Sequence, residues 1–368
     1  MLDITLYLFI VIVAVQLCYY LFIFGKFAFA KPQKNNPKRI PVSVIVCAKN
    51  EAENVARFVP MLMEQDYPDF EVVLIDDASS DATLDIFEAF EKQYPNVKLV
   101  KVENNEAFWG NKKFALTLGI KAASKEYLLF TDADCRPVSK DWIKEMTSHF
   151  TLNKTIVLGY GAYEKVANSF LNKMIRFETM LTAVQYFSWA KLGHPYMGVG
   201  RNLAYKKEEF FNVRGFMDHM KIRSGDDDLF INQAANSKNT TMCVSPESFT
   251  CSEPKKSFKA WFAQKRRHVS TASFYKPFDR MQLAVFYVSQ LLFVLLPIIL
   301  LSFMHQWIIV VSLIGFRYLF TWITLGFAAG KLKEKDVMYW FPVIEMVVII
   351  TQLNIFMTNI FSKPVHWK

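Results

Sequence analysis

The feature that most constrains this chain is a set of long apolar stretches, one at its beginning and the others after residue 280. The first, Ile4–Gly25, contains no charged residue and is long enough, at ~1.5 Å per residue, to cross ~30 Å of hydrocarbon. Three further candidate spans are Met281–Met304, Trp307–Gly330 and Val337–Phe361. We therefore expect one membrane helix before a long charged block and three after it.

A cleaved signal peptide is the alternative interpretation of the first stretch. No basic segment follows Met1 and no small-residue cleavage site precedes the basic flank, which favours a retained helix. The flank after this helix is basic and contains no acid: Lys26, Lys31, Lys34, Lys38 and Arg39. The link Lys331–Asp336 is also rich in lysine. By the positive-inside rule both segments, and the block between the spans, are expected at the cytoplasmic face of the cell membrane.

Two charged residues, Arg317 and Glu345, fall inside predicted spans. Intramembrane charges usually face protein or water rather than lipid. We expect the two to pair with each other, and the alternative is that they line a path for an acceptor.

The composition narrows the partners of the charged block. The chain carries a net charge of +9, which suits nucleic acid, anionic lipid or phosphorylated substrates. Because no basic and aromatic nucleic-acid motif is present, we expect the last two and no nucleic acid. The five cysteines have no CxxC or CxxH spacing, so neither a disulfide framework nor a zinc site is expected.

Between residues 41 and 160, strand-like segments alternate with helix-like ones. The strand-like segments are Val42–Ala48, Phe70–Ile75, Val97–Val102 and Tyr127–Thr131. The helix-like segments are Asn54–Gln65, Thr83–Gln93 and Lys112–Ala123. Near-continuous apolar strands separated by helices predict an α/β fold with a mostly parallel, doubly covered sheet. In such sheets ligands bind at the carboxyl ends of the strands.

Acidic residues follow two of these predicted strands. Asp76 and Asp77 come directly after one, where carboxylates can accept hydrogen bonds from a nucleobase or ribose. Helix capping is the alternative, and it explains Asp81 better than it explains two adjacent acids. Asp132 and Asp134 follow another strand with one residue between them. Such a pair can share Mg²⁺ or Mn²⁺, which take oxygen ligands and substrate phosphates, although surface turns also carry acid pairs.

Two further polar segments lie later in the chain. Ser224–Asp228 contains three adjacent acids, whose repulsion can raise the pKa of one and make it a base. The alternative is a solvated turn before a helix, where acids are favoured. Gln264, Arg267 and His268 lie at i, i+3 and i+4, on one helix face that can hold a diphosphate. The alternative is a cationic helix lying on anionic lipid.

In this order and between these spans, the motifs resemble the membrane-integrated family 2 glycosyltransferases, which include cellulose, chitin and hyaluronan synthases and ceramide glucosyltransferase. The matching residues are Pro41-Val42-Ser43-Val44-Ile45-Val46 with Asn50-Glu51, Asp76-Asp77, Asp132-Ala133-Asp134, Gly225-Asp226-Asp227 and Gln264-x-x-Arg267. The resemblance implies a GT-A fold, an inverting mechanism and a UDP-sugar donor.

The resemblance also implies roles on the donor side. Asp76 and Asp77 would contact the uridine, and Lys112, within Gly110-Asn111-Lys112-Lys113, would lie near the donor. Asp132 and Asp134 would hold the Mg²⁺ or Mn²⁺ that bridges the diphosphate.

On the acceptor side, Asp227 matches the general base of the family and Asp226 lies beside it. Gly200, within Gly198-Val199-Gly200-Arg201-Asn202, resembles the loop that shapes the acceptor site. Gln264 and Arg267, by contrast, would bind the donor, because they match the motif that clamps its pyrophosphate, and His268 beside them would lie on the acceptor side.

The chain departs from the family at His268, where the motif usually ends in Trp. That Trp is associated with the acceptor-binding end, so its loss argues against processive polymer synthesis more than against sugar transfer. We expect transfer from a UDP-sugar to a lipid or lipid-linked saccharide, and the alternative is a processive polysaccharide synthase. A non-catalytic membrane scaffold is a further alternative, but it predicts that the acid motifs are lost, and here all are intact. A receptor or transporter is disfavoured by the large α/β block with acids at its strand ends.

The sequence thus predicts five parts. They are an N-terminal transmembrane helix (1–30), a linker (31–40), a GT-A glycosyltransferase domain (41–256), an interfacial amphipathic region (257–280) and a C-terminal transmembrane region (281–368). Within the third part, an apolar stripe from Phe170 to Val184 favours core packing, with an interfacial helix as the alternative.

Overall fold

The structure of the chain is a computed structural model that describes residues 1–31, 38–103, 112–222 and 224–362. Most of the expected linker, and Gly110 and Asn111, therefore lie outside the described residues. The chain forms two compact units. Among the described residues, the helical unit contains 1–31, 166–192 and 256–362, and the sheet unit contains those within 32–165 and 193–255.

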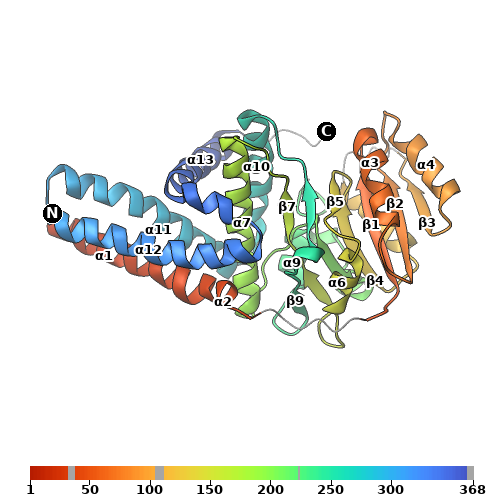
Figure 1. Cartoon of the computed structure of the whole chain (residues 1–368), viewed down its shortest axis with the longest axis horizontal. Coiled ribbons are helices and arrows are strands. Elements are labelled where there is room, and N and C mark those ends of the chain that lie inside the picture. The colour runs from red at the N-terminus through yellow and green to blue at the C-terminus, as the bar shows by residue number, and fades with distance from the viewer. Residues whose placement is uncertain (32–37, 104–111, 223, 363–368) are drawn as a thin grey trace. The chain divides into compact units, whose positions relative to one another are not determined.

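The described part of the sheet unit is built on a seven-stranded sheet of order β3-β2-β1-β4-β8-β6-β9. Figure 1 labels β1, β2, β3, β4 and β9 of this sheet. Four strands pair in parallel: β1 (Val42–Ala48), β2 (Phe70–Asp76), β3 (Val97–Lys101) and β4 (Tyr127–Asp132). The others are β8 (Leu203–Lys206), antiparallel to β4 and to β6 (Ile156–Leu158), and β9 (Thr240–Met242), parallel to β6. This mixed, mostly parallel sheet confirms the predicted α/β fold class.

Helices and a small second sheet complete this unit. The helices are α3 (Ala52–Met63), α4 (Thr83–Gln93), α5 (Lys112–Ala122), α6 (Trp142–Ser148), α8 (Lys207–Asn212) and α9 (Asp228–Ala234), with 3₁₀ turns at Met217–His219 and Pro246–Ser248. The small sheet is β5 (Cys135–Pro137), β10 (Thr250–Ser252) and β7 (Gly161–Tyr163), with β10 in the middle.

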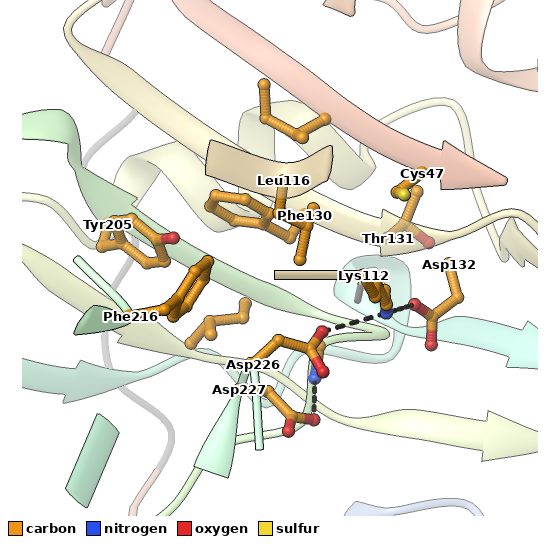
Figure 2. Close-up of a pocket in the computed structure, with 13 residues that line it drawn as sticks. Cys47, Lys112, Leu116, Phe130, Thr131, Asp132, Tyr205, Phe216, Asp226 and Asp227 are labelled. Atoms are coloured by element: carbon orange, nitrogen blue, oxygen red, sulfur yellow. Dashed lines mark hydrogen bonds and ion pairs between the residues drawn. The ribbon is translucent and has the colours of Figure 1, made fainter. Parts of the chain in front are cut away.

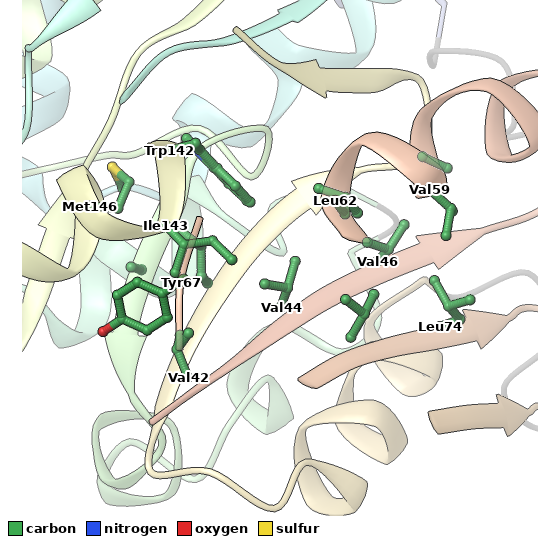
Figure 3. Packing of buried hydrophobic residues seen from close by; sticks show 14 of the residues in the cluster. Val42, Val44, Val46, Val59, Leu62, Tyr67, Leu74, Trp142, Ile143 and Met146 are labelled. Atoms are coloured by element: carbon green, nitrogen blue, oxygen red, sulfur yellow. The ribbon is translucent and has the colours of Figure 1, made fainter. Parts of the chain in front are cut away.

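The core of the sheet unit lies between β1 and the helices that cover it. Alternate residues of a strand face the same side, so Val42, Val44 and Val46 all belong to one apolar cluster (Figure 3). Val59 and Leu62 of α3 belong to the same cluster. Each buried valine or leucine side chain contributes about 1.5–3 kcal/mol, so this packing fixes the position of β1 and of the residues at its carboxyl end.

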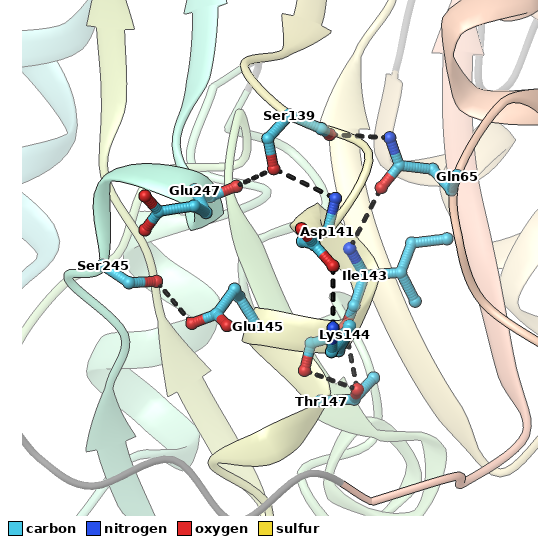
Figure 4. A network of polar contacts seen from close by, with 9 residues as sticks. All are labelled: Gln65, Ser139, Asp141, Ile143, Lys144, Glu145, Thr147, Ser245 and Glu247. Atoms are coloured by element: carbon cyan, nitrogen blue, oxygen red, sulfur yellow. Dashed lines mark hydrogen bonds and ion pairs between the residues drawn. The ribbon is translucent and has the colours of Figure 1, made fainter.

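A polar network holds the chain that follows β4 and β5 (Figure 4). Gln65 Nε2, just after α3, donates to the carbonyl of Ser139 at 2.9 Å, and its Oε1 accepts from the backbone N–H of Ile143 at 3.2 Å. On the other side of α6, Ser245 Oγ donates to Glu145 Oε2 at 2.7 Å. The start of α6 is therefore fixed to segments that are distant in the sequence.

Membrane-length helices dominate the helical unit. Its elements are α1 (Leu2–Leu17), a π-helical stretch (Cys18–Phe24), α2 (Gly25–Ala28), α7 (Phe170–Lys191), α10 (Phe258–Thr271), α11 (Pro277–Ser302), α12 (Trp307–Lys331) and α13 (Phe341–Phe361), with 3₁₀ turns at Ala272–Phe274 and Lys335–Trp340. Within the described residues, four stretches are long and apolar enough to cross a membrane: Leu2–Ala28, Pro277–Ser302, Trp307–Lys331 and Lys335–Phe361. Their number and order match the prediction.

The apolar stripe from Phe170 to Val184 lies on α7, which packs within the helical unit although it comes from the middle of the chain. Its Arg176 is 2% exposed and donates to Glu334 and, at 2.7 Å, to Asp336 in the link between α12 and α13. Buried charges are stable only when paired, so this contact fixes α7 to the link between α12 and α13.

The two charged residues inside the candidate spans, Arg317 and Glu345, form a buried ion pair. Arg317 donates to both carboxylate oxygens of Glu345, at 2.6 and 2.7 Å, and to Gln16 Oε1 at 2.9 Å. This geometry agrees with the pairing interpretation, because the guanidinium of Arg317 is hydrogen-bonded to groups of the protein itself.

We expect Arg317→Met to destabilise the helical unit by about 3–5 kcal/mol, because it leaves Glu345 charged and unpaired in a buried site. The double change Arg317→Met with Glu345→Gln should recover much of this loss. Thermal unfolding of the detergent-purified protein measures both effects, and equal melting temperatures for the single and double variants would contradict the pairing.

Candidate active site

Two strands of the sheet unit, β2 and β4, bring acidic residues to one edge on either side of β1. The register pairs Ala48 of β1 with Asp76 of β2, and Cys47 of β1 with Asp132 of β4. Because the strands are parallel, their carboxyl ends meet at the same edge of the sheet. Asp76 and Asp132 therefore lie on opposite sides of the end of β1.

The turn after β2 has the features of a ligand-binding loop. Asp76 and Asp77 are 2% and 6% exposed. One oxygen of Asp76 accepts from Ser79 N at 3.2 Å, but its Oδ1 and Asp77 Oδ2 have no hydrogen-bond partner among the described residues. Burial raises the pKa of Asp77. Ala78 has φ = 53°, a left-handed conformation that costs a non-glycine residue about 1–3 kcal/mol.

Capping accounts for Asp81, as expected, because its carboxylate accepts from Thr83 N at 3.0 Å and Ala52 N at 3.1 Å. It does not account for the Asp76–Asp77 pair, in which Asp76 Oδ1 accepts no hydrogen bond from the described residues and Asp77 Oδ2 has only an ion pair with Lys49 Nζ at 4.0 Å. Both oxygens can accept hydrogen bonds from the hydroxyl and N–H groups of a ligand.

Lys112 joins two acidic motifs that are distant in the sequence (Figure 2). Its Nζ lies 2.8 Å from Asp132 Oδ1 and 3.0 Å from Asp226 Oδ2. Burial would lower the pKa of Lys112, but the two carboxylates hold it well above its ordinary range. Burial would likewise raise the pKa of Asp226, but the Lys112 ammonium keeps it low. This cluster is therefore a lysinium between two carboxylates.

The cluster forms one side of a pocket whose other side is apolar. Phe130, Tyr205 and Phe216 line the pocket together with Lys112, and Gly200, Leu203 and Asp227 also border it. The rings of Phe130 and Tyr205 stack with centroids 4.6 Å apart. A site with one charged and one aromatic side suits a ligand that has both phosphate and apolar faces.

Asp227 caps α9 and also contacts the loop that holds Gly200. Its Oδ1 accepts from Asp228 N and its Oδ2 accepts from Gly200 N, both at 2.7 Å. Burial, then the charges of Asp226 and Asp228, raise the pKa of Asp227 to about 7. The preceding Gly225 has φ = 91°, and a Cβ there would meet Leu229 Cδ1 at 2.5 Å, so the turn requires glycine.

The residues after β4 fit a divalent cation. One possible ligand atom each from Asp132, Asp134 and Cys135 lies within 4.8 Å of the other two. Burial and the nearby charge of Asp132 raise the pKa of Asp134. Two close carboxylates that disfavour each other's charge form a donor set that a hard cation such as Mg²⁺ or Mn²⁺ stabilises.

Residues that the sequence did not single out support this site. Lys113 is 1% exposed, and its Nζ donates to the carbonyls of His219, Ile222 and Ser224 at 2.8–2.9 Å. It thereby fixes the segment before Asp226. The adjacent lysines 112 and 113 were a signal in the sequence, but nothing there distinguishes a structural lysine from a ligand-binding one.

Arg201 and Asn202 organise the loop that carries Gly200. Arg201 donates to the carbonyl of Gly161 at 2.7 Å and to Ser252 Oγ at 2.8 Å. Asn202 Nδ2 donates to the carbonyl of Ser248 at 2.7 Å. Arg201 thus ties the loop to the small sheet, and Asn202 ties it to the turn that precedes β10.

The structure places Gln264, Arg267 and His268 on α10, in the helical unit. The two residues between them anchor this helix: Lys265 pairs with Glu178 of α7, and Arg266 Nε donates to Asn359 Oδ1 of α13 at 2.9 Å. That Gln264 and Arg267 approach the acids of the sheet unit remains a prediction.

Comparisons with known proteins identify the fold and the family. The mannosyltransferase PcManGT from Pyrobaculum calidifontis, solved in complex with GDP-Man and Mn²⁺, matches 90% of this chain and 98% of its own with a TM-score of 0.60 at 20% identity. The sheet unit therefore has the GT-A fold of nucleotide-sugar glycosyltransferases. The profile of Glycosyl transferase family 2 matches residues 43–226, half of the chain, and the chain belongs to this family.

Two curated relatives match shorter segments. Glycosyltransferase AglE of Haloferax volcanii is 31% identical over 109 residues, which cover 29% of this chain and 34% of the relative. A poly-beta-1,6-N-acetyl-D-glucosamine synthase of Staphylococcus epidermidis is 37% identical over 93 residues, which cover 25% of this chain and 21% of the relative. The matches thus span a fifth to a third of the relatives' lengths.

Proposed function

We propose that this protein is an inverting, metal-dependent glycosyltransferase that moves a sugar from a UDP-sugar to a lipid or lipid-linked saccharide at the cytoplasmic face of the membrane. The observation that carries the proposal is the cluster in which Lys112 joins Asp132 to Asp226, with Asp227 on the same pocket. Four apolar helices in the same chain support an acceptor that is held in the bilayer.

Each group in the sheet unit has a task in this reaction. Asp76 Oδ1 and Asp77 Oδ2, which accept no hydrogen bond from the described residues, accept hydrogen bonds from the uridine, and Lys49 Nζ lies 4.0 Å from Asp77 Oδ2. Lys112 is a cation for the diphosphate, and Asp132 and Asp134 are the residues that would hold Mg²⁺ or Mn²⁺. When bound, the ion supplies positive charge that stabilises the departing diphosphate.

Asp227 is the proposed base. The acceptor hydroxyl attacks the anomeric carbon from the face opposite the diphosphate, its proton passes to the Asp227 carboxylate, and UDP leaves with the electrons of the broken bond. The backbone N–H of Gly200 donates to Oδ2 of Asp227 at 2.7 Å, and that of Asp228 donates to Oδ1. These two hydrogen bonds fix the orientation of the carboxylate that accepts the proton. Gln264 and Arg267 are proposed to bind the leaving pyrophosphate, with His268 on the acceptor side.

The raised pKa of Asp227 predicts the pH dependence of transfer. With a pKa of about 7, the carboxyl is protonated and unable to act as a base at lower pH. We expect kcat/KM to fall by about tenfold per pH unit below this value and to level off above it. A profile that stays flat from pH 7 down to pH 5 would show that the base has an ordinary carboxyl pKa.

Nucleotide release tests the proposal directly. The purified protein, with membrane lipid extract as acceptor, is offered UDP-sugars and GDP-mannose with Mn²⁺ or Mg²⁺. We expect release of UDP from at least one UDP-sugar, and release of GDP alone would correct the donor. A processive polysaccharide synthase is the second candidate, supported by the relative from Staphylococcus epidermidis. It predicts a ladder of long products, whereas our proposal predicts one or a few added sugars.

A further inference from the structure

The position of Lys112 bears on how the cation and the nucleotide bind. Its ammonium group lies between Asp132 and Asp226, 2.8 and 3.0 Å from their oxygens, and its side chain is only 14% exposed. Asp132 also belongs to the group of possible metal ligands with Asp134 and Cys135. One carboxylate therefore faces two positive partners, the lysine and a divalent cation.

These two partners oppose each other. A divalent cation on Asp132 would share the carboxylate with an ammonium group already in contact with it, and two cations this close repel each other strongly in a partly buried site. In the nucleotide-free protein, Lys112 thus supplies the counter-charge for Asp132 and reduces the affinity for the cation.

A diphosphate changes this balance because it is a better partner for the ammonium. Its oxygens carry negative charge and can accept hydrogen bonds from Lys112, which frees Asp132 for the cation. Affinities that depend on each other in this way are reciprocal: if the nucleotide strengthens cation binding, the cation strengthens nucleotide binding by the same factor.

We infer that Lys112 competes with the divalent cation for Asp132, so that the cation and the nucleotide diphosphate bind this protein cooperatively through the transfer of Lys112 from Asp132 to the diphosphate. This inference rests on the proposed function, and it assigns the coupling between the two ligands to a single side chain.

Mn²⁺ binding to the full-length, tag-free protein in detergent tests the inference, with the free-ion electron paramagnetic resonance signal as the readout. Without UDP, Lys112→Met should bind Mn²⁺ about tenfold more tightly than the unsubstituted protein, within the usual range of coupling between sites. The factor by which UDP strengthens Mn²⁺ binding should be smaller by the same tenfold. Lys112→Gln, which keeps a hydrogen-bonding group without the charge, should show the same changes in Mn²⁺ affinity as Lys112→Met. Lys112→Arg, which keeps the charge, should bind Mn²⁺ as the unsubstituted protein does.

Lys121→Met is the matched control, because it removes a lysine from the exposed end of the same helix and should leave the Mn²⁺ affinity unchanged. If both neutral variants at Lys112 bind Mn²⁺ no more tightly than the unsubstituted protein, the inference is overturned, while nucleotide release would still support the function. Failure of the unsubstituted protein to bind either Mn²⁺ or UDP would overturn both.

Discussion

Asp227→Asn is expected to lower the turnover of sugar transfer by about 10²–10⁴-fold, the usual contribution of a general base, while UDP binding persists. The variant removes the group that takes the proton of the acceptor and leaves Asp76, Asp132 and Lys112 in place. Turnover with a saturating donor, together with UDP titration by calorimetry, separates these two effects.

The amide at this position also has a structural cost. Both oxygens of Asp227 accept backbone N–H groups, from Asp228 and Gly200, and an asparagine can accept only one of them. We expect a loss of about 1–3 kcal/mol of stability from the unpaired donor, so the melting temperature of Asp227→Asn must be measured beside its turnover.

Asp228→Asn is the matched control, because it neutralises the next acid of the same segment and keeps the oxygen that accepts from Leu229 N. Since the charge of Asp228 raises the pKa of Asp227, its removal should preserve turnover at high pH and move the acid limb of the pH profile to lower pH. Normal turnover of Asp227→Asn, or equal losses of turnover in both variants, would contradict the assignment of Asp227 as the base.

The second large effect is expected for Asp134→Ala, which should weaken cation-dependent UDP binding by more than about 100-fold, since even residues that only support a metal ligand contribute about 10–100-fold. In the absence of a divalent cation, the Asp134→Ala variant should be no less stable than the unsubstituted protein. Burial and the charge of Asp132 raise the pKa of Asp134, so the ionised carboxylate is unfavourable there without a cation.

Thermal unfolding with and without Mn²⁺ tests this pair of effects together. The unsubstituted protein should gain stability from Mn²⁺ plus UDP by mass action, and Asp134→Ala should not. Asp69→Asn is the control, because Asp69 pairs with Lys125 at 2.7 Å near the start of β2, away from the carboxyl ends of the strands. Equal UDP affinity with and without Mn²⁺ in the unsubstituted protein would contradict the metal site.

The sequence predicted the first half of the sheet because β1, β2 and β4 are long and mostly buried, and β3 is a β-branched and leucine-rich edge strand. β1 and α4 have the expected bounds, and β2, β3 and β4 differ by one residue. The strands β6 and β9 have three residues each, too few to produce a periodic pattern. Their places in the sheet are set by pairing with β8 and with each other, which is tertiary information.

The candidate site was predictable where chemistry leaves a local trace and not elsewhere. Acids that follow buried strands are visible in a sequence, so Asp76 and Asp132 were found without coordinates. The contact of Lys112 with Asp226 joins residues more than a hundred positions apart, so no local pattern in the sequence indicates it. The sequence also does not show that Lys265 anchors α10 to α7 while Arg267 remains the candidate ligand, because this difference depends on contacts with other helices.

The most direct test of the account is the transfer of radiolabelled sugar from a UDP-sugar to membrane lipid by the purified protein and by Asp227→Asn, with the lipid-extractable product separated by chromatography. The account predicts a labelled lipid carrying one or a few sugars with the unsubstituted protein, and a loss of about 10²-fold or more with the variant. Equal labelling by both proteins, or no labelling from any nucleotide sugar, would contradict it.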